Sequence, residues 1–96
     1  MLRISIPEEM AGFIQKLPPQ LKKKIRSGMD EILAEPLSGK GLMEELKGLR
    51  SYRVGRLRIV YKAEPRLVHI VAIGPRRTIY QKALQEVQRA RRKGAH

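Results

Sequence analysis

The sequence predicts a small α+β domain with the element order β-α-α-β-β-β-α. Three observations carry this prediction. Apolar residues alternate with polar ones at residues 2–6, recur with helical spacing across residues 7–36, and join β-branched and aromatic types in three segments of residues 49–73. A chain of 96 residues can bury one modest core. We therefore expect a single domain over residues 1–96, with a basic tail that is flexible from about residue 91.

Prolines bound the first elements. The alternating residues 2–6 predict a short strand that Pro7 ends, because proline cannot extend a strand ladder. From Pro7 the apolar residues recur at helical steps up to Pro18, which predicts a short amphipathic helix. A second apolar stripe then runs to Pro36. We expect the two helices to form a hairpin that packs on a twisted antiparallel sheet.

Turn residues separate the later elements. The string SGKG at residues 38–41 predicts a turn, and the residues after it predict a loop with at most one helical turn. An antiparallel meander is predicted over residues 49–54, 57–64 and 67–73. Its last strand is apolar on both faces and is expected inside the sheet. Gly74-Pro75 predicts a turn before a basic C-terminal helix.

The net charge predicts an acidic partner. The chain has 21 Lys and Arg against nine Asp and Glu, which gives +12. Such an excess raises the local concentration of polyanions through long-range attraction. Nucleic acid, an anionic membrane surface and an acidic protein all satisfy this charge, so charge alone does not choose between them.

Composition also excludes several classes of protein. The chain has no cysteine, which excludes disulfides and thiolate zinc sites, and its two histidines do not stand at metal-ligand spacing from the carboxylates. We expect no metal and no cofactor. No apolar run approaches the roughly 20 residues of a membrane span, and the N-terminus lacks the apolar region of a signal peptide. The sequence therefore predicts a soluble cytoplasmic protein.

The segment SYRVGRLRIVYK at residues 51–62 places cations within an apolar strand. If residues 57–63 form a strand, Arg58, Val60 and Lys62 share one face, and the other face is apolar. A polyanion could bind the cationic face. In the alternative interpretation, these cations and Arg53 are ordinary exposed residues of a sheet that keeps one face in water.

A second cationic motif is GPRRTIY at residues 74–80. Arg76 and Arg77 stand at the start of a predicted helix, where exposed N–H groups favour anions over cations. A bound phosphate would resolve this conflict. In the alternative, the arginines pair with Glu44, Glu45 or Glu86, and Tyr80 is an interface aromatic. His69 is interpreted as a structural histidine of the sheet.

The strings ELKGLRSYRVGRLRIVYKAE and AIGPRRTIY together resemble the RelE/ParE superfamily of bacterial and archaeal toxins. The likeness in length and element order extends over nearly the whole chain. It implies a toxin held in a heteromeric complex by an acidic, partly disordered antitoxin of the RelB type. RelE-like members cleave mRNA in the ribosomal A site, whereas ParE-like members poison DNA gyrase and lack the cleavage residues.

The resemblance also implies roles for residues. Arg58 matches the central catalytic arginine, Arg76 the second, and Tyr80 the catalytic tyrosine, while Arg53 stands where RelE enzymes have a catalytic lysine. Gly55 departs from the family because it stands in place of a second lysine. Lys47 matches a phosphate-contacting arginine. The expected RNA- and phosphate-binding residues are Lys47, Arg50, Arg56, Lys62 and Arg77.

The resemblance therefore implies a metal-independent endoribonuclease that acts on mRNA in the ribosome through attack by the 2′-hydroxyl. Arg58 and Arg76 stay protonated and are suited to holding the scissile phosphate. Tyr80 is expected to take the 2′ proton or to stack on the nucleotide, and Arg53 to assist the leaving group electrostatically. Two alternatives are a ParE-like gyrase inhibitor without nuclease activity and a non-catalytic RNA- or ribosome-binding domain.

Overall fold

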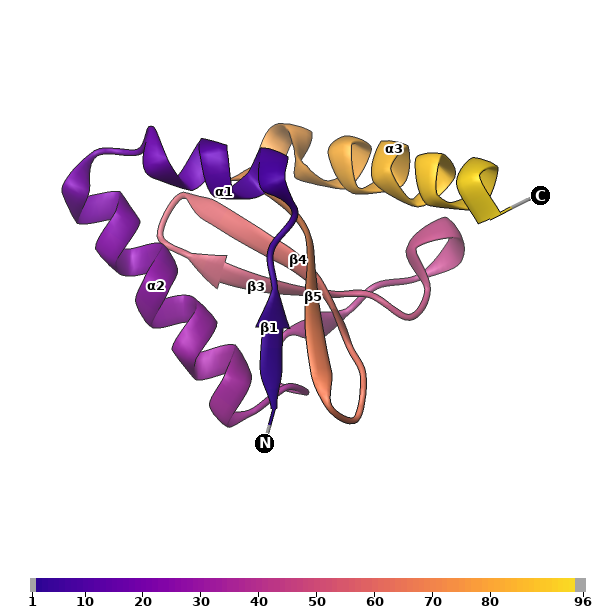
Figure 1. Cartoon of the computed structure of the whole chain (residues 1–96), viewed down its shortest axis with the longest axis horizontal. Helices are drawn as coiled ribbons and strands as arrows, with labels where there is room; N and C mark the ends of the chain where they lie inside the picture. Colours follow the sequence, from indigo (N-terminus) through magenta and orange to yellow (C-terminus); the bar gives the residue numbers. More distant parts are fainter. Residues whose placement is uncertain (1, 95–96) are drawn as a thin grey trace.

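The computed structural model describes residues 2–94 and has the predicted fold class (Figure 1). Residues 95 and 96, the end of the expected basic tail, lie outside the described residues. The elements are β1 (Arg3–Ser5), α1 (Glu8–Gln15), α2 (Pro19–Ala34), β2 (Lys40–Gly41), the 3₁₀ turn η1 (Glu44–Leu46), β3 (Arg50–Val54), β4 (Leu57–Ala63), β5 (Leu67–Pro75) and α3 (Arg76–Gly94).

The five strands form one sheet in the order β1-β5-β4-β3-β2. The meander β3-β4-β5 is antiparallel, as predicted, and β5 lies inside the sheet. The expectation of an entirely antiparallel sheet is wrong, because β1 pairs with β5 in parallel. The direction of a three-residue strand is not encoded in its own pattern, and the long connection through the helices allows a parallel pairing.

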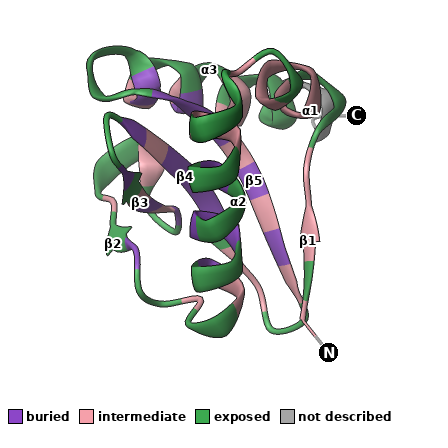
Figure 2. Ribbon diagram, turned by 90° about the vertical axis from the view of Figure 1, so that its left-hand side faces the viewer, coloured by how far each residue is buried: buried purple, intermediate pink, exposed green. Residues whose placement is uncertain are grey.

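Both faces of the sheet bury apolar residues. On one face, α2 packs Ile25 and Ile32 against Ile59 and Ile70 of the central strands. On the other face, α3 covers a second cluster of buried residues: Leu49, Val60, Ala72, Ile79 and Ala83. Figure 2 shows the buried strands between the helices, with the outer side of α2 exposed. The expected open cationic face is therefore partly covered, because Val60 between Arg58 and Lys62 is fully buried.

Two predicted turns are strands. Lys40 and Gly41 of the SGKG segment pair with Ser51 and Arg50, so this segment adds an edge strand to the sheet. The expected turn at Gly74-Pro75 is also wrong. Strand β5 continues to Pro75, and α3 begins at the next residue. Proline is tolerated there because it stands at the end of the strand, where the ladder needs no further N–H donor.

Hydrogen bonds from β3 and β4 fix the connection between α2 and β2. The buried hydroxyl of Tyr61 donates to the Pro36 carbonyl at 2.7 Å and accepts from the Gly39 N–H at 3.0 Å. Nη1 of Arg50, the cross-strand partner of Tyr61, donates to the carbonyls of Leu37 at 3.1 Å and Gly39 at 2.7 Å. A Cβ at position 39 would lie 2.6 Å from the Tyr61 hydroxyl, so glycine is required.

Within residues 2–94, no helix is long and apolar enough to cross a bilayer. Nor do three histidine, aspartate or glutamate side chains in that range gather closely enough to hold a metal ion.

We predict that Tyr61→Phe lowers the free energy of unfolding by about 1–3 kcal/mol, because it leaves the Pro36 carbonyl and the Gly39 N–H without their buried partner. Urea unfolding measures the change. Tyr52→Phe is the matched control, since the Tyr52 hydroxyl bonds to Glu31 at the exposed surface, and its effect should stay within about 0.5 kcal/mol. Equal effects of the two substitutions would contradict the structural role of Tyr61.

Candidate functional site

The candidate site is a depression of about 390 Å³ where the start of α3 meets β2 and β4. Three of the four predicted catalytic residues line it, namely Arg58, Arg76 and Tyr80. They come from segments that are separated in the chain, and the fold brings them together. The complete lining is Lys40, Gly41, Leu42, Met43, Leu46, Arg58, Arg76 and Tyr80.

Strand register and helix periodicity explain this convergence. Lys40 is the cross-strand partner of Ser51, which in turn pairs with Val60. Cross-strand partners project to the same face, so Lys40 and Ser51 lie on the face of the sheet that α3 covers. Arg58 stands two residues from Val60 in β4 and therefore projects to that face too. Arg76 and Tyr80 stand four residues apart in α3 and therefore project from one side of its first turn.

Ser51 links two of the site residues. Its side chain is 2 % exposed, and its Oγ accepts long hydrogen bonds from Nη1 of Arg58 at 3.4 Å and from the Tyr80 hydroxyl at 3.5 Å. Sequence reasoning missed Ser51 as a site residue. The sequence feature that could have indicated Ser51 is a small polar residue at an inward-facing position of a strand. A buried hydroxyl there needs hydrogen-bond partners.

The cations of the depression have no acidic partner among residues whose side chains the structure describes. The ion pairs in this part of the chain join Lys62 and His69 to Glu64, and Arg89 to Glu9 and Glu86, all at 3.5–3.7 Å. The alternative pairing of Arg76 or Arg77 with a glutamate is therefore not seen there. The guanidinium groups of Arg58 and Arg76, next to a helix N-terminus, favour an anion in the depression.

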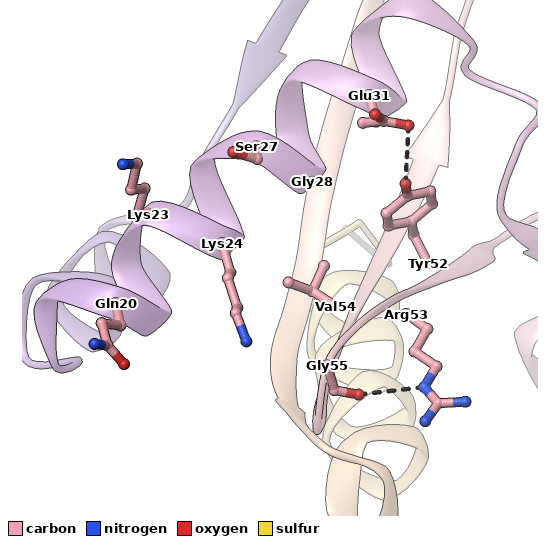
Figure 3. A pocket seen from close by; sticks show the side chains of 10 residues that line it. All are labelled: Gln20, Lys23, Lys24, Ser27, Gly28, Glu31, Tyr52, Arg53, Val54 and Gly55. Carbon is pink, nitrogen blue, oxygen red and sulfur yellow. Dashed lines mark hydrogen bonds between the residues drawn. The ribbon is translucent and has the colours of Figure 1, made fainter.

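Two predicted site residues have other contacts. Arg53 is the cross-strand partner of Arg58, but its Nε donates to the Gly55 carbonyl at 3.2 Å and its side chain is exposed. It lines a different groove, between α2 and β3 (Figure 3). The guanidinium of Arg50 is bonded to the turn carbonyls described above and lies outside the depression.

The remaining predicted phosphate-binding residues are dispersed. Lys47 and Lys62 line a separate depression of about 500 Å³ beside the second half of α3. Arg56, in the β3–β4 turn, and Arg77, in the first turn of α3, are exposed and do not line the candidate site. Their contact with a nucleic acid stays a prediction.

The groove in Figure 3 holds a perturbed tyrosine. Lys23 and Lys24 of α2 stand on one side of it and Tyr52 on the other, where the Tyr52 hydroxyl donates to Oε2 of Glu31 at 3.1 Å. Burial, followed by the bond to Glu31 and its charge, raises the pKa of Tyr52. The folded state thus favours the protonated phenol, and this contribution is lost as pH rises through the raised pKa.

Solved structures of toxins and of toxin–antitoxin complexes are similar in fold to this chain. The toxin–antitoxin complex RelBE2 of Mycobacterium tuberculosis matches with 26% identity and a TM-score of 0.70, covering 78% of this chain and 98% of that chain. The archaeal RelE–RelB complex of Pyrococcus horikoshii matches with 22% identity and a TM-score of 0.65, covering 78% and 94%. A free E. coli RelE variant with two arginines changed to alanine matches with 13% identity and a TM-score of 0.73, covering 93% and 96%.

Sequence comparison identifies the family. A search of curated proteins found no match. The family model of the ParE toxin of the type II toxin–antitoxin system parDE matches residues 8–80, which is most of the chain and includes Arg58, Arg76 and Tyr80. The chain therefore belongs to the ParE toxin family, within the RelE/ParE superfamily of type II toxin–antitoxin toxins.

Proposed function

We propose that this toxin is an endoribonuclease that cleaves mRNA in the ribosomal A site and thereby inhibits translation in the cytoplasm. The observation that carries the proposal is the convergence of Arg58, Arg76 and Tyr80 around one depression. Two permanent cations beside a tyrosine suit phosphodiester chemistry, because charge builds up on the phosphate oxygens as the bond is cleaved.

The cleavage begins with the phosphate. Arg58 and Arg76 donate hydrogen bonds to its non-bridging oxygens and neutralise the charge of the pentacoordinate transition state. The 2′-hydroxyl attacks the phosphorus, and Tyr80 either accepts its proton or stacks on the attacking nucleotide. Ser51 orients Arg58 and the protonated Tyr80 through the bonds that its Oγ accepts, and its own O–H can donate to the Tyr80 oxygen once that oxygen is ionised. Because guanidinium groups supply the electrostatic stabilisation, this scheme works without a metal ion.

The shape of the site favours dependence on the ribosome. A depression of about 390 Å³ contacts only a small part of an RNA strand, so the remaining strand must be held elsewhere for the in-line geometry that the attack requires. Holding reactants in the reactive orientation lowers the activation free energy by about 7–11 kcal/mol relative to free reactants. A ribosome that holds the mRNA codon in the reactive conformation supplies this orientation, so cleavage of free RNA should be poor.

An acidic antitoxin is the second partner. The net charge is +12, and Lys40, Arg58 and Arg76 have no acidic partner among the side chains that the structure describes. An acidic peptide can neutralise this surface. The complexes from M. tuberculosis and P. horikoshii support a heteromeric arrangement with a RelB-like antitoxin.

A ParE-like gyrase inhibitor is the second candidate function. The observation that favours it is the match of the ParE family model to residues 8–80. The position of Arg53 favours it too, since the side chain expected to assist the leaving group bonds to Gly55 outside the depression. A gyrase inhibitor would act by binding and would not need Arg58, Arg76 and Tyr80 in one site.

We predict that the toxin cuts mRNA at fixed codon positions in a translating extract and leaves it intact without ribosomes. Arg58→Ala and Arg76→Ala should each lower the rate about 100-fold or more, because each removes a donor to the developing charge. Primer extension measures the cuts. Arg66→Ala is the matched control, since Arg66 is an exposed arginine in the β4–β5 turn outside the depression.

Other outcomes would redirect the assignment. Intact mRNA together with loss of gyrase supercoiling would establish the gyrase inhibitor. If neither target is affected but RNA binds with a log–log salt slope near −0.7 per phosphate, the chain is a non-catalytic binder.

We predict that Tyr80→Phe lowers the single-turnover rate about 100-fold if the phenol oxygen accepts the 2′ proton. The substitution keeps the aromatic ring, which packs against the cluster beneath α3. The rate on ribosome-bound mRNA decides the role, and a rate equal to that of the wild type would assign Tyr80 to stacking.

We predict that Ser51→Ala lowers the cleavage rate about 5- to 30-fold without unfolding the protein, because Arg58 and Tyr80 each lose an orienting bond of about 1 kcal/mol. Single-turnover kinetics measure the rate and circular dichroism the fold. Ser27→Ala, at an exposed serine of α2, should keep the wild-type rate. An unchanged rate in Ser51→Ala would show that the two bonds are not needed for cleavage.

A further inference from the structure

The depression contains a third cation that neither the charge pattern nor the family motifs indicate. Lys40 lines it together with Arg58, Arg76 and Tyr80. It comes from β2, the two-residue edge strand that was predicted to be a turn. Its register with Ser51 places it on the α3 face of the sheet, at the residue that bonds to both Arg58 and Tyr80.

The backbone that carries Lys40 is held in place from the opposite face of the sheet. The Gly39 N–H donates to the buried Tyr61 hydroxyl, and the Gly39 carbonyl accepts from Arg50 at 2.7 Å. These bonds stand immediately before Lys40 in the chain. A side chain on a fixed edge strand can be positioned reproducibly, and a catalytic group requires this.

The proposed cleavage lacks a proton donor for the leaving group. Arginines stay protonated in proteins, so Arg58 and Arg76 can neutralise charge but do not deliver a proton. A Tyr80 that accepts the 2′ proton acts at the opposite side of the phosphorus from the leaving oxygen. The other lining residues are Gly41, Leu42, Met43 and Leu46, whose side chains carry no ionisable group.

We propose that Lys40 is a catalytic residue whose ammonium group protonates the departing 5′ oxygen. This inference rests on the proposed ribonuclease function. An exposed ammonium group carries a proton at neutral pH, and a departing alkoxide is a much stronger base than an amine, so the transfer is favourable. Lys40 also adds a positive charge beside the phosphate before it gives up the proton.

The step balances as follows. Tyr80, which has first released its proton to water, accepts the proton of the 2′-hydroxyl while the 2′ oxygen forms a bond to phosphorus. The bond between phosphorus and the 5′ oxygen breaks, its electron pair stays on that oxygen, and the Lys40 ammonium donates a proton to it. The products are a 2′,3′-cyclic phosphate and a 5′-hydroxyl. The neutral Lys40 amine then takes a proton from water.

The test separates proton donation from charge. Lys40→Arg keeps the cation without a transferable proton, and Lys40→Met removes both. Both variants and the wild type are assayed by single-turnover cleavage of ribosome-bound synthetic mRNA. One mRNA is unmodified, and the other carries sulfur in place of the 5′ bridging oxygen at the scissile phosphate. A thiolate leaves without being protonated, so the second mRNA needs no acid.

We expect Lys40→Arg to cleave the unmodified mRNA about 100-fold or more slowly than the wild type, and to approach the wild-type rate within about 5-fold on the sulfur-substituted mRNA. Lys40→Met should also cleave the sulfur-substituted mRNA faster than the unmodified one. Its rate on both mRNAs should be lower than that of Lys40→Arg, because the positive charge is missing. Lys16→Arg, at an exposed lysine that follows α1, is the matched control and should keep both rates.

Each other outcome overturns the inference. A wild-type rate of Lys40→Arg on unmodified mRNA would mean that charge alone is used, and a loss that sulfur does not rescue would assign Lys40 to binding or to structure. Neither result would affect the proposed function, because the wild-type protein still cleaves. Absence of cleavage by the wild type would overturn the proposed function and the role of Lys40 together.

Discussion

The buried hydroxyl of Tyr61 is the interaction on which the arrangement of the site depends. It lies at the end of an aromatic side chain that packs in the core beneath α2, and it holds the carbonyl of Pro36 and the N–H of Gly39. Without it, the segment after α2 would have to satisfy these buried groups in another way. With the Tyr61 hydroxyl in place, the segment after α2 continues as the edge strand β2. This strand forms one wall of the depression on the face of the sheet that α3 covers.

The two faces of the sheet therefore have linked roles. Tyr61 and Arg50 are cross-strand partners that face α2, while the neighbouring residues Val60 and Ser51 face α3. Because successive strand residues point to opposite sides, one pair of strands fixes the connection from one face and supports the site from the other. A change of register by one residue would exchange these roles, and the apolar cluster beneath α3 opposes such a change.

Much of the fold could be predicted from the sequence, because proline and glycine bound its elements and apolar periodicity defines their type. Arg58, Arg76 and Tyr80 could be predicted as a group from their motifs, and the depression brings them together. Lys40 could not, because a two-residue strand within SGKG has no periodicity and its place depends on hydrogen bonds from residues far along the chain.

Two predicted site residues, Arg50 and Arg53, use guanidinium donors outside the depression. Arg50 was expected to bind RNA or phosphate and Arg53 to assist the leaving group, but guanidinium groups also donate to backbone carbonyls, and both arginines do so here. The charge of a residue gives no information on whether its donors are already used. In the depression, Arg58 bonds only long and weakly to Ser51 at 3.4 Å, so most of its five donors stay available to a ligand. The convergence of such donors with Tyr80 on one depression distinguishes the candidate site from dispersed exposed cations such as Arg56 and Arg77.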